Sequence, residues 1–229
     1  MKLTEKTLAQ MIDHTELKPN CTQRRLEQLC REAIEYGFWS VCINPVNIPP
    51  AVRLLEGSSV KVCSVVGFPL GATFTETKVF ETQRAVSLGA DEIDMVINIG
   101  GLLDGQLSVV KSDIEGVVRA ASGRPVKVIL ETGFLTDEQK RQACLLSKEA
   151  GAKFVKTSTG FGPSGADPSD VRLMRDVVGS SMGVKAAGGI RNFSDALRMI
   201  QAGASRIGSS AGVAIIEDFR QSRQNESNS

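Results

Sequence analysis

Short apolar runs alternate with amphipathic stretches along almost the whole of this 229-residue chain. The apolar runs are rich in β-branched residues, as buried parallel strands are, and lie at residues 11–14, 40–43, 60–66, 92–97, 126–130, 153–156, 183–187 and 204–207. Stretches of helical period separate them, as at residues 24–36, 76–88, 108–121, 137–149 and 169–178. The alternation predicts a parallel α/β protein, and eight strands favour a closed (β/α)8 TIM barrel. A doubly wound open sheet is the alternative.

Helix boundary signals support this division of the chain. Thr73 with Glu76, and Thr136 with Gln139, match the capping box at a helix start. Asp167 stands before a proline, which suits the first helical position. Three of the expected helices end in a glycine, at Gly89, Gly151 and Gly203.

The chain reads as one domain. No Pro/Ser-rich or charged spacer divides it, so we expect residues 1–220 to form a single barrel. Residues 221–229 are polar and predict a disordered tail.

Composition excludes several classes of function. The net charge is +1, with 27 basic and 26 acidic residues, so no strong field directs the chain to nucleic acid or to an anionic membrane. We find neither a membrane span nor a signal peptide. The five cysteines have no metal-binding spacing, and His14 is the single histidine. These features predict a cytoplasmic protein with reduced thiols and no metal centre.

Two lysines occupy positions where lysines are costly. Lys156 and Lys185 lie in apolar runs about one strand–helix–strand unit apart, which places them on neighbouring parallel strands. Desolvation and like-charge repulsion favour the neutral amine, which is a nucleophile able to form a Schiff base with a carbonyl. The alternative is a strand-end lysine that reaches solvent or pairs with a glutamate.

Carboxylates occur in strand-like runs as well. Asp94 lies inside the fourth strand, and the fourth and sixth strands of a barrel contribute inward side chains to the same layer. We therefore expect Asp94 to meet Lys156 and Lys185, with a structural ion pair as the alternative. Asp13, at the end of the first strand, is a second candidate for the cavity, whereas we interpret Asp91 and Glu92 as structural.

Glycine-rich segments follow the last two strands, at residues 187–191 and 207–212. Such loops in a barrel hold phosphate through backbone N–H groups. Serine hydroxyls and Arg191 would add donors and charge. Two tight turns without a ligand are the alternative. The pattern Gly-x-Gly-x-x-Gly at residues 160–165 is interrupted by Pro163, and we interpret it as ordinary loop glycines rather than a dinucleotide site.

The chain resembles the deoxyribose-phosphate aldolases over roughly residues 5–217. The segments that carry the resemblance are residues 12–19, 41–45, 66–71, 92–98, 130–132, 154–161 and 184–191. The most specific of them are Lys156-Thr157-Ser158-Thr159-Gly160 and Lys185-Ala186-Ala187-Gly188-Gly189. The resemblance implies a class I aldolase on a (β/α)8 barrel, which needs neither metal nor cofactor.

The resemblance also implies a reaction and its residues. Such enzymes reversibly cleave 2-deoxyribose 5-phosphate, a small phosphosugar, into glyceraldehyde 3-phosphate and acetaldehyde. Lys156 would form the Schiff base, Lys185 would keep it neutral, and Asp94 would relay protons. The residues implied at the substrate are Asp13, Thr15, Cys42, Thr157, Thr159 and Gly160. Those implied at the phosphate are Gly188, Gly189, Arg191, Gly208, Ser209 and Ser210.

Two positions depart from the family. Some members carry a lysine near the phosphate where this chain has Phe161, so we expect phosphate binding to rely more on backbone donors and Arg191. Some members end in a tyrosine that reaches the active site, but Tyr36 is the one tyrosine here. Family members are commonly dimers or tetramers, so the resemblance implies a homo-oligomer.

The sequence is also compatible with three different functions. A phosphosugar isomerase on the same barrel would use the glycine loops without Lys156 as a nucleophile. A barrel that binds a phosphometabolite without catalysis would use the same loops. A nicotinamide-dependent dehydrogenase is a more remote possibility.

Overall fold

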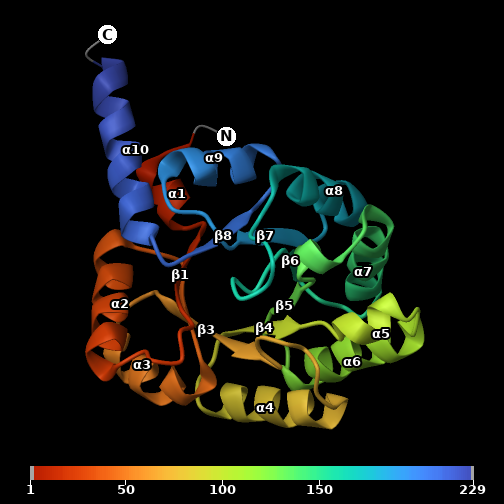
Figure 1. Ribbon diagram of the computed structural model, residues 1–229. Coiled ribbons are helices and arrows are strands. Elements are labelled where there is room, and N and C mark those ends of the chain that lie inside the picture. The colour runs from red at the N-terminus through yellow and green to blue at the C-terminus, as the bar shows by residue number, and fades with distance from the viewer. Residues whose placement is uncertain (1–2, 228–229) are drawn as a thin grey trace.

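The computed structural model describes residues 3–227 and shows a closed barrel of eight parallel strands (Figure 1). The strands are β1 (Ile12–Glu16), β2 (Ser40–Ile43), β3 (Lys61–Val66), β4 (Glu92–Val96), β5 (Val126–Ile129), β6 (Phe154–Lys156), β7 (Gly183–Ala187) and β8 (Arg206–Ser209). They follow one another in chain order, and β8 pairs with β1 to close the sheet. The expected (β/α)8 barrel is confirmed, and the open sheet is excluded.

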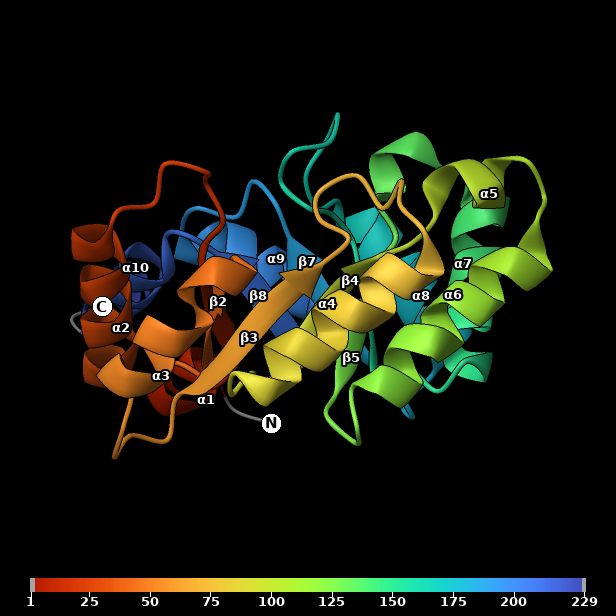
Figure 2. The ribbon, with the colours of Figure 1, turned by 90° about the horizontal axis from the view of Figure 1, so that it is seen from below.

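Helices surround the barrel, and the loops after β1, β3 and β6 project from one end of it (Figure 2). The helices are α1 (Glu5–Ala9), α2 (Gln23–Tyr36), α3 (Ile48–Leu54), α4 (Thr75–Ser87), α5 (Ile99–Leu103), α6 (Leu107–Ala120), α7 (Asp137–Glu149), α8 (Pro168–Val178), α9 (Phe193–Gln201) and α10 (Gly212–Ser227). Short 3-10 turns, η1 (Pro45–Asn47) and η2 (Thr132–Phe134), follow β2 and β5. Within the described part of the chain, no helix has both the length and the apolar character needed to cross a membrane.

The boundary signals are mostly confirmed. Thr136 and Gln139 form the expected capping box at α7, and Asp167 caps α8 by accepting from the Ser169 amide. The capping box expected at Thr73 is wrong, because α4 begins at Thr75 after an uncapped Phe74. The Thr75 hydroxyl instead donates to the Asp113 carboxylate on α6 at 2.9 Å, a long-range contact that the local pattern does not contain.

Helix α10 continues into the segment 221–229 that composition predicts to be disordered, and residues 228–229 lie outside the described residues. Two contacts hold its first part against the barrel. The Tyr36 hydroxyl donates to Glu217 at 2.9 Å, and the Arg220 guanidinium binds both oxygens of Glu5 at 2.7 and 2.9 Å. The end of α10 projects past α1 and α9 (Figure 1), and within this part the Arg223 guanidinium donates to the Leu3 carbonyl at 3.1 Å.

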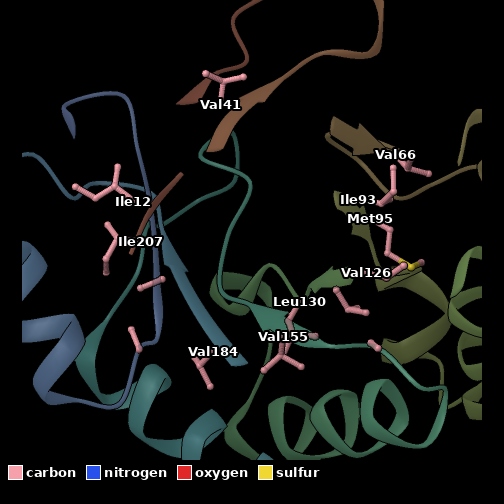
Figure 3. Packing of buried hydrophobic residues seen from close by; sticks show 14 of the residues in the cluster. Ile12, Val41, Val66, Ile93, Met95, Val126, Leu130, Val155, Val184 and Ile207 are labelled. Atoms are coloured by element: carbon pink, nitrogen blue, oxygen red, sulfur yellow. The ribbon is translucent and has the colours of Figure 1, made fainter. Parts of the chain in front are cut away.

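The main apolar core lies between the outer face of the barrel and the helices. Alternate strand residues supply it, such as Ile93 and Met95 of β4, which are fully buried (Figure 3). Because side chains alternate along a strand, Glu92 and Asp94 point to the opposite face, into the barrel. The fold thus places an apolar layer outside the sheet and leaves inward positions for polar groups.

Gly71 provides a test of how the β3–α4 loop sits on the end of β4. Its φ is +67°, and a Cβ there would lie 2.1 Å from the carbonyl oxygen of Ile97. Gly105 is a matched control, since its φ is +71° but a Cβ would meet nothing within 4 Å. We expect Gly105→Ala to lower the free energy of unfolding by about 1–2 kcal/mol, which is the cost of left-handed backbone alone. Gly71→Ala should lower the free energy of unfolding by more than this, because its Cβ would also clash with the Ile97 carbonyl oxygen. Urea denaturation followed by circular dichroism measures both, and equal losses would contradict the close approach.

Candidate active site

Six charged side chains form a closed ring of ion pairs inside the barrel, in which acids and bases alternate. The ring runs Asp94–Lys127–Glu92–Arg206–Asp13–Lys185 and back to Asp94, with nitrogen–oxygen distances of 2.7, 2.6, 3.2, 2.9, 2.5 and 2.8 Å in that order. We call these six residues the charge ring. Around the ring each base bridges two carboxylates and each carboxylate bridges two bases, and Lys127 also lies 3.9 Å from Asp13 across the ring. Three acids and three bases leave the ring as a whole with no net charge.

The charge ring is buried inside the barrel. Its six residues are at most 6% exposed, and four of them are fully buried. Burial raises the pKa of Asp94, but the ammonium groups around it outweigh burial and hold that pKa well below its usual range. Burial likewise lowers the pKa of Lys127 and Lys185, yet the neighbouring carboxylates raise both pKa values above the ordinary lysine value. Mutual pairing therefore compensates the desolvation of each charge.

Lys156 touches the ring at a single point. It is the last residue of β6, and its Nζ lies 2.9 Å from Asp94 Oδ2. The same oxygen accepts from Lys185 at 2.8 Å, and Lys156 and Lys185 are direct partners in the pairing of β6 with β7. The structure thus brings together the three residues that strand parity predicts to meet.

Two thiols complete the surroundings of Asp94. Cys42 and Cys63 are partners in the pairing of β2 with β3, and Cys63 Sγ lies 3.1 Å from Asp94 Oδ1. The two sulfurs and the carboxylate lie within 4.8 Å of one another, as the ligands of a metal ion would. Three ammonium groups already contact that carboxylate, so a cation would be repelled from this cluster. The cluster fits thiols that donate to a carboxylate better than it fits a metal site.

A cavity of about 600 Å³ opens at the carboxyl ends of β1, β6, β7 and β8. Ten of the residues predicted from the sequence line it, namely Thr15, Lys156, Thr159, Gly160, Gly188, Gly189, Arg191, Gly208, Ser209 and Ser210. The other five predicted residues, Asp13, Cys42, Asp94, Thr157 and Lys185, are fully buried and do not line it. Lys156 therefore lies at the boundary between the buried charge ring and the open cavity.

Hydroxyl groups fix the loops that form the cavity wall. Thr157 Oγ1 donates to the Ala187 carbonyl and accepts from the Ala187 amide, both at 3.1 Å, and so joins the ends of β6 and β7. Ser209 Oγ donates to the Ile190 carbonyl at 2.7 Å, which joins the two glycine-rich loops. Both hydroxyls thus hold the wall in place.

Lys127 and Arg206 are charged site residues that the sequence reasoning missed. Lys127 lies within the apolar run 126–130, as Lys156 and Lys185 lie within theirs, so the same argument applied to that run would have found it. Arg206 lies within the run 204–207 in the same way. At the cavity mouth, Lys18 and Arg25 line the wall, and no sequence pattern separates them from ordinary surface cations.

Glu131 is also absent from the sequence prediction. It follows β5 with a left-handed backbone (φ +54°), and the residue is only 2% exposed. It accepts from the backbone amide of Thr159 at 3.2 Å and from the Thr159 hydroxyl, and burial raises its pKa. A Cβ on Gly162 would lie 2.6 Å from the Glu131 carboxyl carbon, so the loop after β6 packs directly on this acid.

This site can hold a carbonyl compound next to a buried amine, and comparisons with known proteins agree with that chemistry. The model of the DeoC/LacD family aldolases matches residues 7–218. The deoxyribose-phosphate aldolase of Thermococcus gammatolerans is 59% identical over 217 residues, covering 93% of this chain and 96% of that protein. That of Caldanaerobacter subterraneus is 58% identical over 93% of this chain and 94% of that protein. The crystallised tetrameric deoxyribose phosphate aldolase of Aeropyrum pernix superposes with a TM-score of 0.89 at 39% identity, covering 95% and 92% of the two chains.

Proposed function

Since this chain belongs to the DeoC/LacD family of aldolases, we propose that it cleaves 2-deoxyribose 5-phosphate reversibly to glyceraldehyde 3-phosphate and acetaldehyde through a Schiff base on Lys156. The chain is a carbon–carbon lyase, as its relatives at 56–59% identity are. The observation that carries the proposal is the position of Lys156. It is the base that contacts the charge ring and also lines the cavity.

The reaction begins at the aldehyde carbon C1 of the open-chain sugar. The neutral amine of Lys156 attacks C1 to form a carbinolamine, which takes up a proton and loses water to give a protonated imine. Loss of the proton from the C3 hydroxyl then breaks the C2–C3 bond. Its electron pair moves to C2, giving an enamine, while C3 becomes the aldehyde of glyceraldehyde 3-phosphate. Protonation at C2 and hydrolysis of the imine release acetaldehyde and restore the amine.

Asp94 and Lys185 support these proton transfers from beneath the cavity. Asp94 Oδ2 lies within hydrogen-bond distance of the Nζ atoms of Lys156 and Lys185, so a proton passes among the three without a large movement. Neither Asp94 nor Lys185 lines the cavity, so we propose that a water connects Asp94 with the substrate. The Lys185 ammonium binds the same Asp94 oxygen as Lys156, so the two amines share one acceptor beneath the cavity.

The phosphate occupies the end of the cavity formed by the loops after β7 and β8. Backbone N–H groups at Gly188, Gly189 and Gly208 and the Ser210 hydroxyl approach an anion closely there, and Arg191 adds charge. Lys18 and Arg25 face the same cavity and add two further cations. Thr15, Thr159 and Gly160 line the part that holds the sugar hydroxyls.

Covalent trapping tests the nucleophile. We expect incubation with acetaldehyde and borohydride to add one reduced two-carbon group to the protein, because reduction fixes the imine as a stable amine. Intact-mass and peptide mass spectrometry should locate it on Lys156. Lys156→Arg should take up no such group and have no aldolase activity, while the exposed Lys153→Arg control should behave as the parent. An unmodified parent at saturating aldehyde would overturn the proposal in favour of a different phosphosugar chemistry.

A second variant tests the phosphate end. Arg191→Met should raise KM for 2-deoxyribose 5-phosphate about tenfold with little change in kcat, because it removes one charge-assisted contact of about 1.4 kcal/mol. The kinetics with unphosphorylated 2-deoxyribose should not change. Arg172→Met, on the exposed face of α8, is the control. An equal rise in KM for the phosphorylated and the unphosphorylated sugar would show that Arg191 does not bind the phosphate.

We further propose that the enzyme is a homo-oligomer, either a dimer or a tetramer. Large apolar side chains on α4 and the loop before it are strongly exposed in the single chain, with Leu70, Phe74 and Phe80 at 72, 80 and 69%. The Aeropyrum pernix structure is tetrameric. Sedimentation equilibrium should give two or four times the chain mass of 24.5 kDa, and a single-chain mass would overturn this proposal.

A cytoplasmic location fits the same proposal. All five cysteines are free thiols, as expected in a reducing compartment. Fractionation of the source cells tests this location, and recovery outside the cytoplasm would contradict it.

A further inference from the structure

We propose that Lys127 is a positioning residue for this reaction, because it balances the charges of Glu92 and Asp94 and holds Asp94 Oδ1, so that Lys156 shares its one carboxylate oxygen, Asp94 Oδ2, with Lys185. The inference rests on the Schiff-base function proposed above. Lys127 is fully buried and does not line the cavity, so any effect on the reaction passes through Asp94 and Lys156.

The balance of charge around Lys156 depends on Lys127. The charge ring contains three carboxylates and three bases, and every member has two ring neighbours of opposite sign. Lys156 is a fourth base on this neutral set. Among residues 3–227 its one ionic partner is Asp94 Oδ2, and Lys185 already binds that oxygen at 2.8 Å. Lys156 and Lys185 therefore compete for one carboxylate oxygen, and the ring offers Lys156 no second acceptor.

The orientation of Asp94 also depends on Lys127. Lys127 and Asp94 are direct partners in the pairing of β4 with β5, and Lys127 Nζ lies 2.7 Å from Asp94 Oδ1. The same nitrogen lies 2.6 Å from Glu92 Oε2, which anchors it at a fixed position. Because Lys127 holds Asp94 Oδ1, the other carboxylate oxygen, Asp94 Oδ2, faces Lys156 and Lys185. Lys127 thus sets both the direction of the proton-relaying oxygen and the charge available to Lys156.

Cys42, Cys63 and Glu131 are the remaining titratable groups around Lys156, and Cys42 and Glu131 both interact with its charge. Cys42 and Cys63 face Asp94 from β2 and β3, and burial raises the pKa of Cys63 well above the usual thiol value, so that thiol stays neutral. Glu131 follows β5 and lies outside the ring. Among the described residues its bonds go to Thr159, and it makes no ion pair with the four bases. Its contribution is common to the parent and to each variant below.

The test is the pH profile of kcat/KM for four proteins. Lys127→Met removes a positive charge and keeps a side chain of similar length, so Lys156 should hold its proton to higher pH. The acid limb of the kcat/KM profile should move to higher pH by about one unit or more. At the acidic end kcat/KM should then fall about tenfold, whereas at alkaline pH it should change little. Glu92→Gln should move the limb in the opposite direction. The double variant restores a neutral ring and should return the limb close to its position in the parent.

Lys78→Met is the matched control for the loss of a buried lysine. Lys78 is fully buried and binds Asp113 at 2.5 Å and the Val96 carbonyl at 3.0 Å, outside the charge ring. Its replacement should lower stability without moving the acid limb. A Lys127→Met profile that falls equally at every pH, or that matches Lys78→Met, would overturn the proposal by making Lys127 merely structural.

Trapping with acetaldehyde and borohydride distinguishes a failure of the proposed Schiff-base function from a failure of the proposed role of Lys127. If the parent is not trapped at Lys156, the proposed function itself fails. If the parent is trapped and all variants are trapped with the same pH dependence, only the role of Lys127 fails. If circular dichroism shows that Lys127→Met does not fold, the pH profile of Glu92→Gln compared with that of the parent still tests the role of the ring charge. A downward shift supports the proposal, and an unchanged limb overturns it.

Discussion

The charge ring is the interaction on which the rest of this structure depends. Six buried charges in the middle of a parallel barrel are stable only because each has two neighbours of opposite sign at 2.5–3.2 Å. Strands β1, β4, β5, β7 and β8 all contribute, so the ring requires the barrel to be closed and in register. The outward alternate residues form the apolar core against the helices, and this division of faces lets a charged interior coexist with a stable fold.

The ring also explains why one lysine among four buried strand cations is suited to chemistry. Lys127, Lys185 and Arg206 each bridge two carboxylates and are held in their charged forms. Lys156 shares one oxygen with Lys185 and is the member of this group that reaches the cavity. Its difference from the others lies in its place at the end of β6, where the inward face of the barrel meets the open end. Position along the strand therefore separates a structural base from a nucleophile.

Much of this arrangement follows from local sequence patterns, and the part that does not is long-range. Period-two alternation and strand order predict the barrel and the meeting of Lys156, Lys185 and Asp94, because alternation decides which side chains point inward and the order of the strands decides which strands are neighbours. The partnership of Glu92 with Arg206 joins β4 to β8 across the interior, and it depends on the stagger of the closed barrel, which no local pattern encodes. Local patterns therefore mark Glu92 as structural and do not reveal its place in the ring. The same limit explains Thr73, whose capping signal gives way to the distant bond between Thr75 and Asp113.

The cavity contains Phe161 at a position where some relatives have a lysine, and its cations come from other elements. Phe161 stands where some relatives carry a lysine, and it packs edge-on against Phe68, with ring centroids 5.5 Å apart. Of this pair, Phe161 lines the cavity and places an aromatic ring on the wall after β6. Positive charge instead enters from the loop after β1 and from α2, through Lys18 and Arg25, and Arg25 is steadied by Glu16 at 3.1 Å. In the proposed site, the cations opposite the phosphate are therefore Lys18, Arg25 and Arg191 of the cavity wall, whereas the charges beneath Lys156 belong to the charge ring. Because the two sets of charges belong to different layers of the barrel, substitutions at the mouth can alter phosphate affinity without altering the state of the amine.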